Sequence, residues 1–194
     1  IHTTESLIIY HNHTWISIPE EIQVSKTFPF IVASQDKLVV GGFRDPIQLI
    51  DTSDKRWAYF PKQSFQCQDK LERSWFINSD QQVVVHNPAK DQWKSFGVSE
   101  GIIDNPVRVY CSENNLKWVV GSHQNKAAIS IYENGKWITH IHEKLGTTID
   151  RQSIFETEEH EIVFGSGDVR RVRKHDKGGV VIYKLINGEY QFEY

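Results

Sequence analysis

The chain has 194 residues, a formal net charge of −3 and 12% aromatic residues, among them six tryptophans. A charge this close to neutral gives no global electrostatic reason to bind nucleic acid or an acidic membrane, and the apolar and aromatic content excludes a disordered chain. No apolar run approaches the length of a membrane span, so membrane attachment is expected only through segments outside this sequence. Because the chain begins at Ile1 and contains no methionine, we expect a processed protein, an excised domain or part of a longer one.

Five segments share one pattern in chain order: a short β-branched run, a polar turn, and an aromatic residue that opens a second run. They read IIYHNHTW (8–15), QLIDTSDKRW (48–57), VVHNPAKDQW (84–93), SIYENGKW (130–137) and VIYKLINGEY (181–190). The pattern predicts β-hairpins, with Tyr190 standing where the other segments have tryptophan. Asn134-Gly135 and Asn187-Gly188 supply residues that tolerate the positive φ of a tight turn. The aromatic anchors lie 42, 36, 44 and 53 residues apart.

A second series lies between the hairpins and has nearly the same period. It reads LVVGGF (38–43), SWFINS (74–79), KWVVGS (117–122) and EIVFGS (161–166). Two interleaved series indicate four strands per period, so the sequence predicts an all-β protein, a β-propeller of four-stranded antiparallel blades. We expect the tryptophans to pack between adjacent blades.

The count is about four blades plus an extra hairpin. The expected boundaries are a half blade at 1–27 and blades at 28–64, 65–104, 105–150 and 151–194. The first strand of each blade is expected near 28–34, 65–71, 105–112 and 151–157. An unclosed ring leaves sheet edges exposed, so we expect the chain to be part of a larger ring.

Residues 101–122, GIIDNPVRVYCSENNLKWVVGS, resemble the two-component regulator propeller repeat. The matching positions are Asn105, Val107, Leu116, Trp118, Val120, Gly121 and Ser122. Other copies depart from the repeat, since Val39 and Ile162 stand in the place of its tryptophan. The resemblance implies a sensing or binding module, often the periplasmic input region of a sensor kinase or nucleotide-cyclase-type protein, or a free secreted propeller. It therefore implies a periplasmic or extracellular location, and it brings no catalytic residue because its signature residues are structural.

We expect a ligand face formed by the loops after the second and fourth strands, because functional residues concentrate in loops on a rigid scaffold. The longest is GSGDVRRVRKHDKGG (165–179), whose guanidinium groups suit carboxylate, phosphate or sulfate oxygens. The alternative is a solvated loop without a ligand. The candidate ligand-binding residues are Arg44, Arg108, Arg151, Arg170, Arg171 and Arg173. The expected partner is an anionic small molecule or oligosaccharide, and not nucleic acid, since the loop lacks an aromatic platform. For Arg108 and Arg151 the alternative is that they satisfy strand-end backbone groups.

No phosphate-binding glycine loop or nucleophile elbow occurs, so we expect a non-catalytic module without a cofactor. One alternative is a glycosidase or polysaccharide lyase that uses Asp104, His142, Asp150 and Arg151. Another is a structural interaction module whose open blades pair with the remainder of the same polypeptide or a second copy. A large apolar end face would support that last reading.

Cysteines and histidines complete the candidates. Cys67 and Cys111 are expected as buried free thiols, with a disulfide in an oxidising compartment as the alternative. His140 and His142 alternate along a predicted strand and therefore share a face. Since no further ligand lies at a metal-binding spacing, we expect a surface pair and no metal site.

Overall fold

The structure is a computed structural model. It describes residues 8–11, 13–17, 30–34, 37–41, 47–51, 57–60, 63–166 and 178–194. Before residue 63 the description covers the backbone, together with the exposed side chains of His13 and Trp15. The chain divides into two compact units, one formed by residues 1–65 and 87–92 and the other by residues 66–86 and 93–194.

The first part of the chain forms a hairpin and a four-stranded sheet. β1 (Ile8–His11) pairs antiparallel with β2 (Thr14–Ser17). The sheet has the order β3-β4-β5-β6, and its strands are Phe30–Ser34, Lys37–Gly41, Ile47–Asp51 and Trp57–Phe60. Each strand pairs antiparallel with the next along the chain.

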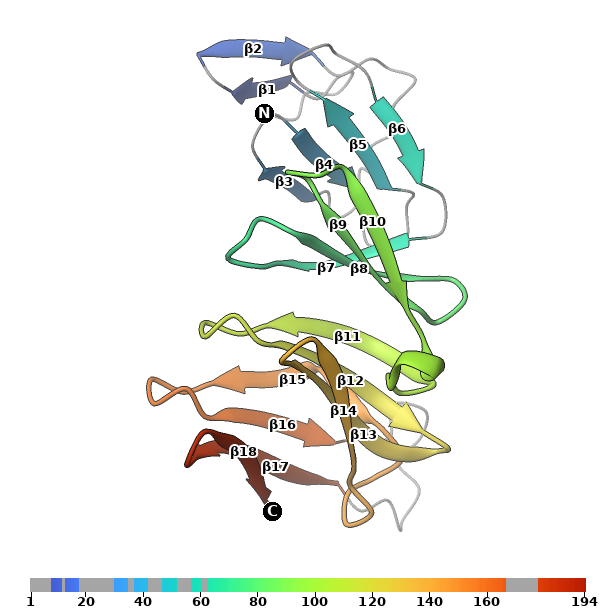
Figure 1. Ribbon diagram of the computed structural model, residues 1–194, viewed down its shortest axis with the longest axis vertical. Helices are drawn as coiled ribbons and strands as arrows, with labels where there is room; N and C mark the ends of the chain where they lie inside the picture. The colour runs from blue at the N-terminus through green and yellow to red at the C-terminus, as the bar shows by residue number, and fades with distance from the viewer. Residues whose placement is uncertain are drawn as a thin grey trace. The chain divides into compact units, whose positions relative to one another are not determined.

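Three further sheets repeat this order (Figure 1). The first contains β7 (Gln63–Gln68), β8 (Ser74–Asn78), β9 (Val83–Asn87) and β10 (Gln92–Phe96). The second contains β11 (Asn105–Cys111), β12 (Lys117–His123), β13 (Lys126–Glu133) and β14 (Lys136–Ile141). The third contains β15 (Ile149–Glu156), β16 (Ile162–Ser166), β17 (Gly179–Ile186) and β18 (Glu189–Glu193).

These sheets confirm the predicted fold class, an all-β chain with four four-stranded antiparallel blades of propeller type and an additional hairpin. In the described ranges the one helical element is a 3₁₀ turn, η1 (Val98–Glu100). None of the described helical residues could form a span that crosses a membrane.

Local chemistry explains the turns between the third and fourth strands. Asn134 and Gly135 have φ values of 49° and 80°, and Asn187 and Gly188 have 52° and 85°. Two successive positive φ values suit a tight hairpin turn, and asparagine followed by glycine adopts them at low cost. The hairpin prediction is confirmed at both positions.

The sheets of the second unit are held together by two apolar interfaces. The first interface lies between β7–β10 and β11–β14 and contains Trp75, Ile77, Val83, Val85, Phe96, Ile102, Ile103, Val109, Val119, Ala128 and Trp137. The second interface lies between β11–β14 and β15–β18 and contains Trp118, Val120, Ala127, Ile129, Ile131, Leu145, Ile149, Ile162, Phe164, Val181 and Tyr183.

One aromatic contact recurs at both interfaces. Trp75 on β8 meets Trp137 on β14 edge-on, with ring centroids 6.3 Å apart. Trp118 on β12 meets Tyr190 on β18 in the same manner at 5.0 Å. Edge-to-face pairs contribute about 0.5–1.5 kcal/mol beyond burial of their area. The prediction that these tryptophans pack between blades is confirmed, and Tyr190 takes the role of Trp137.

The expectation that Ile162 replaces the repeat's tryptophan is wrong. The Ser112 N–H binds the carbonyl of Leu116 and the Thr157 N–H binds that of Glu161, at 3.0 and 2.9 Å, so the two turns correspond. Ser122 lies ten residues after Ser112, whereas Ser166 lies nine residues after Thr157. Because side chains alternate along a strand, one missing residue exchanges the faces. Ile162 therefore points back into the second interface, and Val163 takes the position of Trp118.

Candidate functional site

The structure describes two of the six candidate arginines. Arg108 lies on β11 and Arg151 on β15, the first strands of successive sheets. Arg44, Arg170, Arg171 and Arg173 lie outside the described residues, so the predicted cationic loop stays a prediction.

The two described arginines meet. The Arg108 guanidinium donates a hydrogen bond from Nη1 to the backbone carbonyl of Arg151 at 2.7 Å. Arg108 is half-buried and Arg151 is exposed. This contact matches the alternative reading of Arg108, a side chain that satisfies a backbone group. It also brings the Arg108 guanidinium to the first strand of the adjacent blade, and we call this contact, together with the exposed Arg151, the Arg108–Arg151 site.

Neighbouring first strands are linked in other ways as well. The Val109 N–H donates to the side-chain oxygen of Gln66 on β7 at 3.3 Å. Beyond Arg151, Gln152 and Ser153 are also exposed. The Asp150 carboxylate accepts a hydrogen bond from the Gln152 N–H of the same strand at 2.7 Å. The first strands thus present cationic and amide groups, a set suited to carboxylate or sulfate oxygens through charge-assisted hydrogen bonds.

The candidates for the enzyme alternative have separate partners. Asp104 accepts the backbone N–H of Gln124 at 2.9 Å and lies 3.7 Å from His123 Nδ1. His142 is buried, with Nε2 2.8 Å from the Tyr183 hydroxyl and Nδ1 3.2 Å from the Tyr194 hydroxyl. The described contacts therefore direct Asp104 and His142 toward different neighbours.

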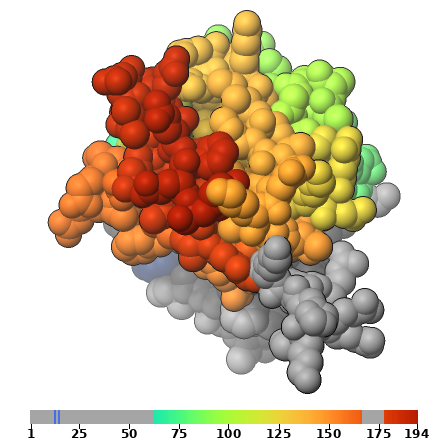
Figure 2. Space-filling model, turned by 90° about the horizontal axis from the view of Figure 1, so that it is seen from below, coloured from blue at the N-terminus to red at the C-terminus, as the bar shows by residue number. Residues whose placement is uncertain are grey.

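His142 corrects the expectation of a surface histidine pair. Burial lowers its pKa to about 4, and the nearby His140 acts in the same direction. Phe192 stacks edge-on at 4.7 Å, and in Figure 2 the C-terminal strands (red) adjoin the segment near residue 140 (orange). The aromatic neighbours of His142 belong to β17 and β18. Alternation of side chains along β14 does not show that these strands cover the histidine. Within the described residues no group of three or more histidine, cysteine or carboxylate side chains could hold a metal ion.

The expectation of free thiols is also wrong, because Cys67 and Cys111 form a disulfide between β7 and β11. Their Cα atoms lie 6.0 Å apart, inside the range that a disulfide spans. The two residues are 44 positions apart in sequence. Their neighbourhood depends on the stacking of two sheets, which the spacing alone does not predict.

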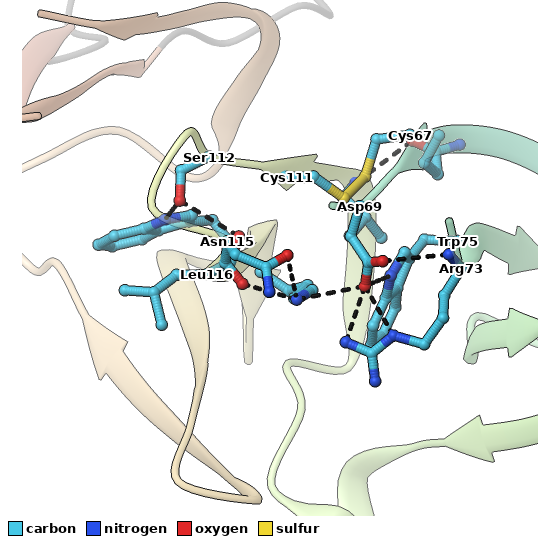
Figure 3. Close-up of a disulfide and its surroundings, with 12 residues drawn as sticks. Cys67, Asp69, Arg73, Trp75, Cys111, Ser112, Asn115 and Leu116 are labelled. Atoms are coloured by element: carbon cyan, nitrogen blue, oxygen red, sulfur yellow. Dashed lines mark hydrogen bonds and ion pairs between the residues drawn. A yellow bond between two sulfur atoms is a disulfide. The ribbon is translucent and has the colours of Figure 1, made fainter. Parts of the chain in front are cut away.

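A buried ionic cluster beside the disulfide was missed by sequence reasoning (Figure 3). The Asp69 side chain is fully buried and accepts hydrogen bonds from Trp75 Nε1 at 3.0 Å and Arg73 Nε at 2.8 Å. Lys117, only 3% exposed, lies 3.2 Å from Asp69 and also donates to the Asn115 carbonyl at 2.6 Å. Its partners come from two different sheets, so the cluster connects β7–β10 to β11–β14.

The pKa shifts in this cluster follow from burial and charge. Burial alone would raise the pKa of Asp69, but the hydrogen bonds from Trp75 and Arg73 and the positive charge of Lys117 hold it below its ordinary value. Burial lowers the pKa of Lys117, against the attraction of Asp69. One feature of the sequence could have pointed to this cluster. Asp69 lies six residues before Trp75, as Ser112 lies six residues before Trp118, and in both pairs the earlier side chain accepts the indole N–H.

The second interface has a different polar contact at the same end. Glu156, whose side chain is 6% exposed, accepts the Tyr110 hydroxyl at 2.8 Å and the Glu113 N–H at 3.0 Å. Burial and the Glu156 carboxylate raise the pKa of Tyr110 to about 12. Both interfaces therefore place a buried carboxylate at the turn between the first and second strands.

Neither a protein-family model nor a curated protein sequence matches the chain. Among solved structures it is similar to PorZ, a bacterial surface component of the type-IX secretion system of Porphyromonas gingivalis, at 12% identity and a TM-score of 0.53, over 92% of this chain and 28% of that one. It is similar to the extracellular domain of a hybrid two-component system, BT3049, from B. thetaiotaomicron, at 16% identity and a TM-score of 0.52, over 95% and 25%.

The extracellular domain of a one-component system from the same organism, BT4673, matches at 11% identity and a TM-score of 0.53, over 97% of this chain and 28% of that one. The chain thus spans about a quarter of the length of these three structures. Identities this low show the fold alone, and they agree with blades of propeller type.

Proposed function

We propose that this chain is a non-catalytic binding module of propeller type, part of an extracytoplasmic sensing protein, and that the Arg108–Arg151 site binds an anionic group. The observation that carries the proposal is the Arg108 bond to the Arg151 carbonyl, which places the Arg108 guanidinium at the first strand that carries the exposed Arg151. A uronic-acid carboxylate of an oligosaccharide has the charge and the planar pair of oxygens that a guanidinium recognises.

Two further observations support the extracytoplasmic part of the proposal. A disulfide such as Cys67–Cys111 persists in oxidising compartments and is rare in the cytosol. The solved structures with a similar fold include extracellular domains of a hybrid two-component and a one-component system. Cell fractionation combined with thiol alkylation tests this part, and a cytosolic protein with both cysteines alkylated without reduction contradicts it.

The binding site is tested by calorimetry with an oligogalacturonate and a neutral oligosaccharide of equal length. We expect binding of the acidic sugar alone, weakening as salt is added. Arg151→Ala removes one guanidinium but keeps the backbone carbonyl that Arg108 uses, so it is the cleanest variant. It and Arg108→Ala should each weaken binding about 10- to 100-fold, the range for a lost charge-assisted hydrogen bond.

Lys136→Ala, which removes an exposed cation at the turn between β13 and β14, is the matched control and should leave the affinity unchanged. Equal effects of all three substitutions contradict a specific site and indicate general charge attraction. Assays for new reducing ends and for unsaturated sugar products should stay at background. Turnover that disappears in Asp104→Asn favours the enzyme alternative instead.

A further inference from the structure

The two interfaces use the same face of each preceding blade. On β11–β14, the face that meets the next sheet presents Trp118, Val120, Ile129 and Ile131, all essentially buried. The register pairs Trp118 with Ile131 and with Tyr110 of the first strand, and it pairs Val120 with Ile129. Trp75, Ile77, Val83 and Val85 form the corresponding face of β7–β10. A blade of this protein thus buries this face against the next blade.

The last sheet carries the same arrangement of apolar residues. Val163 pairs with Ile182 and with Phe155, as Trp118 pairs with Ile131 and Tyr110. Val180, opposite Gly165, takes the position of Ile129. We call Phe155, Val163, Val180 and Ile182 the Phe155 face.

The Phe155 face points away from the second interface. Phe155 and Val163 alternate along their strands with Ile154, Ile162 and Phe164, which pack into that interface. Val180 and Ile182 alternate likewise with Val181 and Tyr183. Phe155 is 64% exposed and Val180 is 47% exposed, whereas at the second interface Tyr110 is half-buried and Ile129 is fully buried. The rim is charged, since Lys184 lies 3.6 Å from Glu161 and 2.6 Å from Glu193.

We propose that the Phe155 face is a docking surface for one further blade of this repeat. The occupant presents the chemistry that β15–β18 presents to Trp118: two buried apolar residues on its second strand, like Ile162 and Phe164, and an aromatic residue that opens its fourth strand, like Tyr190. The argument is the continuity of an interface that already occurs twice in the chain. It is independent of the anionic ligand proposed above.

The test adds a blade of this chemistry. A second copy of residues 142–194, which includes the connection before β15, is joined after Tyr194 of the full chain. Phe155→Asp is then made in the first copy and in the unextended chain. In the unextended chain the substituted residue stays in water, so the Tm should change by about 2 °C or less. In the extended chain the charge is buried, so the Tm should fall by roughly 6 °C or more.

Leu185→Asp is the matched control, because Leu185 is 57% exposed and points to the opposite face of β17. Its effect should be the same in both chains. Val180→Asp should repeat the result for Phe155 on a second strand. Equal effects of Phe155→Asp in the two chains overturn the proposal, as does an appended segment that proteases digest as readily as an unfolded chain. Light scattering should show a monomeric parent, and a dimer that Phe155→Asp dissociates assigns the face to a second copy and also overturns it.

Discussion

The first and second interfaces have similar centres, but they differ at the turn between the first and second strands, which we call the turn end. Both centres stack a second-strand tryptophan edge-on against an aromatic residue of the next blade. At the turn end, the first interface has a disulfide and the buried Asp69–Lys117 pair. At the turn end of the second interface, Glu156 accepts hydrogen bonds from a tyrosine hydroxyl and a backbone N–H. The repeat therefore preserves apolar packing, while polar contacts are particular to each pair of blades.

Among the substitutions that separate the two turn ends, we expect Asp69→Ala to destabilise the protein most. Lys117 is only 3% exposed and would lose its carboxylate partner, which costs about 3–5 kcal/mol of unfolding free energy. Arg73 is 24% exposed at its side chain and can turn to water. Urea unfolding measures the loss.

Glu156→Ala is the matched change at the second interface, and we expect a smaller loss of about 1–3 kcal/mol. The Tyr110 hydroxyl and the Glu113 N–H are neutral donors, and His160, 3.5 Å from Glu156, is half exposed and can reach water. The double variant Asp69→Leu with Lys117→Met should recover most of the stability, since apolar residues of similar volume replace a buried pair well. Equal losses for Asp69→Ala and Glu156→Ala would falsify the distinction between the two turn ends.

Removal of the disulfide should have the next largest effect. Cys67 and Cys111 close a loop over a sequence separation of 44, and constraint of the unfolded chain by such a loop contributes about 2–4 kcal/mol. The variant with both cysteines changed to serine should lose this amount in urea unfolding. A dithiol reductant should destabilise the native protein equally and leave the variant unaffected. Unfolding of the native protein that does not respond to the reductant contradicts the bond.

The smallest expected effect is the dependence of the unfolding free energy on pH that comes from His142 at the second interface. His142 has its pKa lowered to about 4 in the folded chain by burial, so the neutral form is the one that the fold accepts. Its contribution is fully present above the unfolded pKa of about 6.5 and is lost as the pH falls through about 4, with a total of roughly 2–3 kcal/mol. Asp69 acts at lower pH, because its pKa lies below the ordinary value.

His142→Phe should flatten the fall in stability between about pH 7 and pH 4.5. Leu185→Gln, a change at an exposed position of β17 that adds and removes no titratable group, serves as the control and should retain the native slope. If the native protein and His142→Phe lose equal stability over this range, another group governs the response.

Hairpin spacing was sufficient to predict the blades, because a turn followed by an aromatic residue is a local signal that needs no knowledge of neighbours. Tyr190 was correctly placed in the tryptophan position on this basis. The expected place of Ile162 was wrong, because the segment between the turn and Ser166 is one residue shorter than the segment that ends at Ser122, and this exchanges the two faces of β16. The candidate arginines Arg108 and Arg151 were named from their strands, but their mutual contact depends on the stacking of two sheets.

The sequence by itself determined the all-β class, the four-stranded repeat and the aromatic anchors, since alternation and turn chemistry act over a few residues. Tertiary structure alone decided which cysteines, carboxylates and histidines are buried together. Cys67 meets Cys111, Asp69 meets Lys117, and His142 meets Tyr183 across blade boundaries. These pairs are more than 40 residues apart in sequence, and their energies come from burial that exists only once the sheets have stacked.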